Sequence, residues 1–184
     1  MVYVALLRGI NVGGNNKIEM KRLKQVFEEA GMEQVVTYIN SGNIVFVDRS
    51  RSAQALSVLL EEAIAAAFDL RIRVLIRSLE DFEGLLRELP STWTNDEAMK
   101  SEVLFLWDEI DDAATLEQIT WKPEFEDVRY VKGAILYAIG RKDATRGSLT
   151  KLVGTKLYSQ MTIRNVNTTR KLHTLMQQAA AALD

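Results

Sequence analysis

Apolar residues in this sequence fall into short runs and into periodic stretches, and the short runs indicate β-strands. Residues 2–7, 44–47, 103–107 and 135–139 are apolar at both odd and even positions. Apolar side chains at both odd and even positions are typical of a strand that is buried on both faces. We therefore expect sheets whose two faces are both covered.

The first stretch between strands has the periodicity of a helix. Residues 19–30 place Met20, Leu23 and Phe27 at helical spacing, and Gly31 follows as the expected C-cap. This pattern predicts an amphipathic helix directly after the first strand and its glycine-rich loop.

A hairpin, a second helix and a fourth strand follow. Residues 35–39 and 44–47 flank a polar turn, which predicts a β-hairpin. Ser50 or Ser52 can cap the next helix, and residues 71–77 alternate apolar side chains with mostly arginine. The first half of the chain therefore has the order βαββαβ.

The second half repeats this order. Its expected elements are strand 103–107, helix 111–119, hairpin strands 128–131 and 135–139, helix 148–158 and strand 161–164. Two helices, about 79–89 and 168–183, are left over and are the simplest candidates to cover the second sheet faces. The sequence thus predicts an α+β protein of two ferredoxin-like (α-β plait) units packed together, with these two extra helices.

Domain boundaries follow from this order. We expect an N-terminal α-β plait with a linking helix in residues 1–90 and a C-terminal plait with a terminal helix in residues 101–184. Residues 91–100 lack a periodic pattern and are the expected connection.

The loop from residue 8 to residue 17 is the first candidate binding segment. It contains three glycines, three asparagines and two cations: Arg8, Gly9, Asn11, Gly13, Gly14, Asn15, Asn16 and Lys17. Glycine permits close approach of a ligand to the backbone, and amides near a helix start attract anions. The glycine spacing matches neither of the two common nucleotide-binding fingerprints, so a glycine turn that only fixes the path of the chain is the alternative.

Two other polar segments resemble this loop in composition. Ser41 and Asn43 lie in the turn of the first hairpin, and residues 162–171 bring Arg164, Asn165 and Asn167 to the end of a strand. Asn167 or Thr168 is the expected cap of the final helix. Because Arg170 and Lys171 lie at the helix end that disfavours cations, we expect an anionic group nearby, either a ligand or a carboxylate.

These segments carry a resemblance to a known family. Residues 5–15, residues 38–43, and residues 162–165 with 167–168 resemble the three signature motifs of the bacterial DUF1697 family of unknown function. The resemblance implies two ferredoxin-like units, in agreement with the pattern above, and it implies no established activity.

Composition excludes several classes of function. With 23 basic and 25 acidic side chains the net charge is −2, so no global field attracts nucleic acid or an anionic membrane. The absence of cysteine excludes thiol catalysis and disulfides, and with a single histidine we expect no metal site. No cofactor is predicted. No apolar run is long enough to span a membrane, and we expect a cytoplasmic protein without a membrane partner.

Three hypotheses for function remain open. The first is a small phosphate-bearing ligand, bound or chemically altered at loop 8–17 together with the Arg164-Asn165 motif. The second is RNA or single-stranded nucleic acid, stacked on Tyr3, Tyr38 or Phe46. The third is a protein-interaction scaffold whose asparagines only brace turns. No residue is assigned a catalytic role, and the pattern does not specify an oligomeric state.

Overall fold

The structure of the protein is a computed structural model, and it describes residues 1–183. Residue contacts divide the chain into two compact units, residues 1–82 with the C-terminal residues from Leu172 onward, and residues 83–171. The division falls inside two helices, α3 (Leu79–Glu88) and α6 (Val166–Ala181). Most of α6 thus clusters with the first unit, although the sequence suggested that the terminal helix belongs to the second. The domain limits 1–90 and 101–184 stay a prediction.

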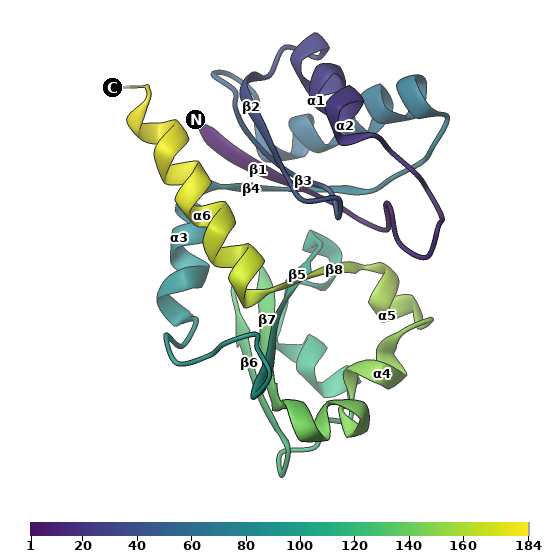
Figure 1. The fold of residues 1–184 in the computed structure, drawn as a ribbon, viewed down its shortest axis with the longest axis vertical. Coiled ribbons are helices and arrows are strands. Elements are labelled where there is room, and N and C mark those ends of the chain that lie inside the picture. The colour runs from purple at the N-terminus through teal and green to yellow at the C-terminus, as the bar shows by residue number, and fades with distance from the viewer. Residues whose placement is uncertain (184) are drawn as a thin grey trace. The chain divides into compact units, whose positions relative to one another are not determined.

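The first unit contains a four-stranded antiparallel sheet and two helices that pack on one side of it (Figure 1). Its elements are β1 (Val2–Leu7), α1 (Met20–Glu29), β2 (Glu33–Tyr38), β3 (Asn43–Val47), α2 (Ala53–Phe68) and β4 (Val74–Ser78). The strand order is β2-β3-β1-β4, with β1 and β3 in the middle. Each residue of these two strands is buried, as expected from their apolar side chains at both parities.

The second unit has a sheet of the same order, β6-β7-β5-β8. Its strands are β5 (Met99–Leu106), β6 (Glu126–Val131), β7 (Ala134–Gly140) and β8 (Met161–Asn165). Both halves therefore have the strand order of a ferredoxin-like unit. The predicted α+β class is confirmed.

The connections of the second unit differ from the expected helices 111–119 and 148–158. They are the short 3₁₀ segments η1 (Asp108–Ile110), η2 (Ala113–Gln118) and η3 (Arg141–Arg146), followed by α4 (Leu149–Leu152) and α5 (Lys156–Ser159). The helix expected at 148–158 is interrupted at Gly154, where φ is +85°. A left-handed residue of this kind ends an α-helix, so the chain restarts at the Thr155 cap.

A buried carboxylate ties the start of α4 to the sheet. Glu126 on β6 accepts hydrogen bonds from the Tyr137 hydroxyl (2.8 Å), the Lys122 amide (2.7 Å) and both the amide and hydroxyl of Ser148. Burial opposes ionisation of Glu126, but these hydrogen bonds outweigh it and lower the pKa of its carboxyl group. Burial and the nearby Glu126 also raise the pKa of Tyr137. One side chain thus holds β6, β7 and the start of α4 together.

The apolar side of α6 contributes to the core. Leu172 and Met176, one helical turn apart, are both fully buried. The part of this helix that clusters with the first unit carries no Asp, Glu, Lys or Arg from residue 172 to residue 183. Burial of its apolar side chains is therefore its main contribution to stability.

We predict that Leu172→Ala lowers the free energy of unfolding by about 2–5 kcal/mol, because it removes a fully buried side chain and leaves a cavity. Denaturant titration measures the change. Gln177→Ala, on the exposed side of the same helix, is the matched control and should change stability by less than about 0.5 kcal/mol. Equal stability of the two variants would show that α6 is an appendage.

A second prediction concerns the stability of the fold at acidic pH. Because the pKa of Glu126 is lowered in the folded protein, its carboxylate stabilises the fold above the pKa of the unfolded chain. This stability is lost as the pH falls through the lower, folded pKa. Glu126→Gln should be less stable near neutral pH by about 1–3 kcal/mol, and its stability should fall less steeply between about pH 5 and pH 2. Unfolding titrations across this range, with the exposed Glu124→Gln as control, test the prediction; parallel pH profiles for wild type and Glu126→Gln would contradict it.

Candidate functional site

The opening loop forms a small β-hairpin, residues 11–16, which we call the finger. The amide of Asn15 donates to the carbonyl of Val12 (3.0 Å), and the two glycines of the tip, Gly13 and Gly14, have φ of +58° and +78°. Two successive positive φ values are the requirement of a type I′ turn, which glycine meets without strain. An added Cβ at either glycine would meet nothing within 4 Å, so it is the backbone conformation, not crowding, that requires glycine here.

Asn11 closes the base of the finger. Its Nδ2 donates to the carbonyls of Ile18 (3.0 Å) and Asn40 (2.9 Å), and its Oδ1 accepts from the amide of Ile18 (2.8 Å). Its φ of +54° is one that asparagine tolerates better than most residues. The side chain expected to contact a ligand is therefore engaged in bracing the loop.

The hairpin turn that contains Ser41 and Asn43 packs beside this loop. The amide of Leu7 donates to the carbonyl of Gly42 (2.8 Å), and a Cβ on Gly42 would lie 2.7 Å from the Leu7 Cβ. Asn43 is buried, and its Nδ2 donates to the Tyr38 carbonyl (3.0 Å) and to the Ser41 hydroxyl (2.9 Å). The first two sequence motifs thus form one structure in the first unit, and the side chains of Ser41 and Asn43 hold the turn.

Cations lie close to the finger. The half-buried Arg8 ends β1 and its amide donates to the carbonyl of Arg73 (3.0 Å), which places the two residues side by side. Lys17 follows the finger, and the side chains of Lys17, Arg71 and Arg73 are exposed. Within residues 1–183, neither Lys17 nor Arg71 has a carboxylate within ion-pair distance. This end of the first unit therefore offers positive charge to solvent.

The third motif belongs to the second unit and is largely structural. Arg164 is 7% exposed, and its Nη1 donates to the Thr162 hydroxyl (2.9 Å) and the Ile163 carbonyl (2.8 Å). Burial lowers the pKa of Arg164 to about 10. The Oδ1 of Asn165 accepts from the Thr168 amide (2.8 Å), so Asn165 caps α6, which corrects the expected cap at Asn167 or Thr168.

The remaining polar residues of this motif bind the segment before β5. Asn167 donates to the carbonyl of Asn95 (2.9 Å), and Arg170 donates to the carbonyls of Trp93 (2.7 Å) and Pro90 (2.9 Å). The sequence predicted an anionic group near Arg170. In the structure, backbone carbonyl oxygens accept hydrogen bonds from its guanidinium group. A common site for the Arg8 and Arg164 motifs stays a prediction.

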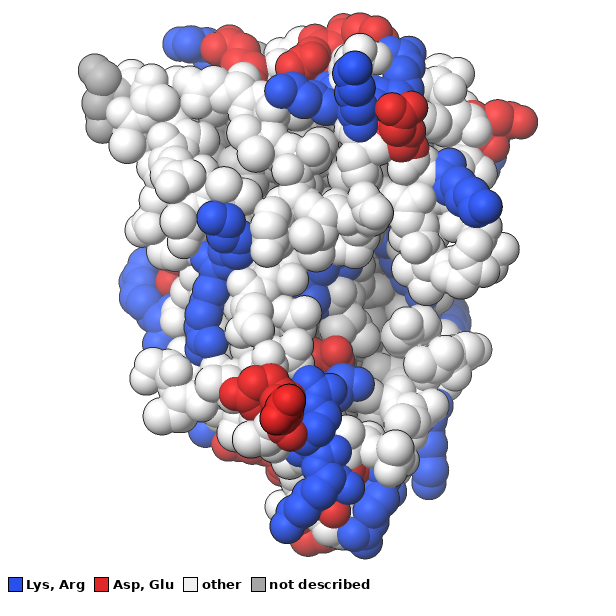
Figure 2. All heavy atoms as spheres, in the orientation of Figure 1, with Lys and Arg blue, Asp and Glu red and all other residues white. Residues whose placement is uncertain are grey.

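The aromatic side chains proposed to stack on nucleic acid bases are only partly available. Tyr3 and Phe46 are buried and stack on each other with ring centroids 5.8 Å apart, whereas Tyr38 is half-buried. On the face drawn in Figure 2, basic and acidic side chains are interspersed instead of forming one extended positive surface. The stacking role is therefore wrong for Tyr3 and Phe46.

Sequence patterns missed the buried Glu126 cluster. Its partner Ser148 lies 22 residues away, and no local spacing connects the two. Among residues 1–183, no group of three or more His, Cys, Asp or Glu is arranged to hold a metal ion. None of the helices in the described part of the chain is long and apolar enough to cross a membrane.

Comparisons with known proteins agree with this fold. The family model described as a protein of unknown function (DUF1697) matches residues 1–137. The chain is also similar to the solved structure of conserved bacterial protein SP0830 from Streptococcus pneumoniae, with 34% sequence identity and a TM-score of 0.81. That match covers 95% of this chain and 98% of the other. No curated protein matches the chain. Because the family model matches well over half of its residues, the chain belongs to the DUF1697 family of proteins of unknown function.

Proposed function

We propose that this protein binds a small phosphate-bearing ligand at the exposed finger of its first unit. One observation carries the proposal: the tip amides and Lys17 are both open to solvent. Within the described chain, no acceptor is hydrogen-bonded to the amides of Gly13 or Gly14, and no carboxylate pairs with Lys17. Backbone amides and lysine ammonium groups are both groups that phosphate oxygens prefer.

The candidate residues fall into two groups, proposed ligand contacts and residues whose side chains support the loop and turn. Gly13, Gly14 and Asn15 at the tip and Arg8, Gly9 and Lys17, which flank the finger in the sequence, are the proposed contacts. Asn11, Ser41 and Asn43 hold the finger and the neighbouring turn, because their side-chain groups already have partners inside the protein. A rigid base under an open tip keeps the entropy lost on binding small.

Participation of the C-terminal motif is a separate part of the proposal. Arg164, Asn165 and Asn167 would add to the site only if the ligand extends beyond the finger. The low exposure of Arg164 favours a supporting role for it. A cytoplasmic location is also proposed, supported by the absence of cysteine.

A second candidate is a protein-interaction scaffold. The bonds of Asn11 and Asn43 favour it, because asparagines that serve turns need no ligand to explain them. The exposed finger would then contact a protein partner, and phosphate compounds would not change the stability of the chain.

Thermal unfolding with a panel of inorganic phosphate, nucleotides and sugar phosphates tests the proposal. A ligand at 100 times its dissociation constant should add about 2.7 kcal/mol to the free energy of unfolding. Gly13→Ala and Gly14→Ala should reduce this gain more than Lys17→Ala, because the glycines set the geometry of the amides whereas one exposed lysine adds a screened charge. Arg164→Gln tests the C-terminal motif.

Two variants of the second unit are matched controls. Gly154→Ala replaces another glycine with positive φ and open space around it, and Lys132→Ala removes another exposed lysine. Both should keep the full ligand-dependent gain, measured against each variant without ligand. If no compound in the panel stabilises the wild-type protein, phosphate binding is contradicted and the scaffold is favoured.

A further inference from the structure

Strand β2 leaves one edge of the first sheet open. It pairs only with β3, so the backbone groups on its other side have no strand partner. A bulge between Glu33 and Val36, with Gln34 at a φ of +50°, confines the regular pairing to residues 36–38. Val36 is 42% exposed at this edge. An open edge with an exposed β-branched residue is a surface on which another strand can pair.

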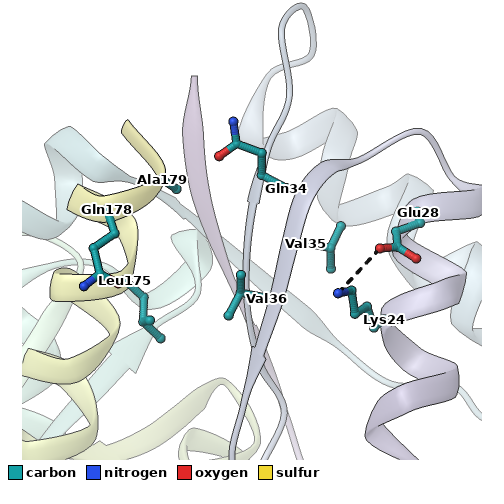
Figure 3. A pocket seen from close by; sticks show the side chains of 8 residues that line it. All are labelled: Lys24, Glu28, Gln34, Val35, Val36, Leu175, Gln178 and Ala179. Atoms are coloured by element: carbon teal, nitrogen blue, oxygen red, sulfur yellow. Dashed lines mark ion pairs between the residues drawn. The ribbon is translucent and has the colours of Figure 1, made fainter. Parts of the chain in front are cut away.

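A hollow of about 380 Å³ lies along this edge, with α1 on one side and α6 on the other (Figure 3). Its lining comes from three segments that are far apart in the sequence: Lys24 and Glu28 of α1, residues 34–36 of β2, and Leu175, Gln178 and Ala179 of α6. The open strand therefore has a helix beside each of its two faces.

The α6 side of the hollow is uncharged. No Asp, Glu, Lys or Arg occurs from residue 172 to residue 183, and Figure 2 shows this part of the surface almost free of charged side chains. Leu175 is half-buried, and Leu183 further along is exposed. Depletion of charge is typical of the centre of a protein interface.

The α1 side is charged in an unusual order. Lys21, Arg22 and Lys24 occupy the first half of this helix, and Glu28 and Glu29 occupy its end. The helix dipole favours the opposite order, acids at the start and bases at the end. Lys24 and Glu28 lie 3.8 Å apart with both side chains nearly half exposed, and an exposed pair with lysine first contributes little.

We infer that this edge binds a second copy of the chain, strand β2 to strand β2, around a two-fold axis. When this axis is perpendicular to the sheet, the two β2 strands are antiparallel and the two α1 helices are antiparallel as well. Because Lys24 and Glu28 both flank residues 34–36, each Lys24 then faces the Glu28 of the other copy. The reversed charge order of α1 becomes complementary in this pair, and the two helix dipoles also oppose each other favourably.

The order of charges along α1 favours a second copy of the chain over an extended peptide from another protein. A peptide strand would satisfy the backbone of β2 equally well, and the charges of α1 already form the ion pairs Arg22–Glu29 and Lys24–Glu28 within the helix, but a second copy matches its basic and acidic halves with groups of opposite charge across the interface. A self-complementary surface, in which one half of a helix matches the other half, is the property of an interface between identical chains. This interface does not depend on the proposed ligand.

Sedimentation of the full chain over micromolar to millimolar concentrations tests the inference. The wild-type protein should form a dimer, and Lys24→Glu or Glu28→Lys should each raise the dissociation constant at least about tenfold by placing like charges opposite each other. The double variant Lys24→Glu with Glu28→Lys restores both pairs and should restore the dimer. Circular dichroism checks that each variant keeps its fold.

A substitution in strand β2 itself provides an independent test. Val36→Lys should weaken the dimer, whereas Val58→Lys, at a residue of α2 that is 48% exposed, is the matched control and should leave it intact. A wild-type chain that stays monomeric at every concentration overturns the inference and leaves the edge to a peptide partner. A dimer that is insensitive to both Lys24→Glu and Val36→Lys overturns it too, because its interface lies elsewhere.

Discussion

The candidate site depends on the hydrogen bonds of the Asn11 carboxamide. Its three hydrogen bonds join the two ends of the opening loop at Ile18 and connect the loop to the hairpin turn at Asn40. Without it, the amide and carbonyl of Ile18 would lose their partner, which is costly because both bonds are partly buried. The loop is therefore fixed at its base and open at its tip.

Much of the fold follows from the sequence because its signals are local. The strands β1 and β3 contain runs that are apolar at both odd and even positions and are buried on both faces, and α1 follows from helical spacing. The short connections of the second unit were harder to predict. The start of α4, for example, is held by Glu126, whose partner Ser148 is 22 residues away, so no periodicity over one window describes it.

The opening loop and the neighbouring turn were predictable from the sequence, but the role of each of their residues was not. An asparagine in a turn has the same pattern whether it contacts a ligand or a carbonyl, and the Asn40 carbonyl that engages Asn11 is 29 residues distant. Arg170 is a similar case, because its carbonyl partners at Trp93 and Pro90 lie more than 70 residues away. The order of charges along α1 is visible in the sequence. Its proposed role in pairing two copies could be inferred only after the structure showed the open edge of β2.

Amide hydrogen exchange in the native protein tests the division between a braced base and an open tip most directly. The Ile18 amide, bonded to the Asn11 side chain, should exchange slowly, and the amides of Gly13 and Gly14 should exchange at nearly the rate of an unfolded chain. Replacement of Asn11 by alanine should remove the protection at Ile18 and leave the glycines unchanged. Fast exchange at Ile18 in the wild-type protein, or strong protection of both glycines, would contradict the account.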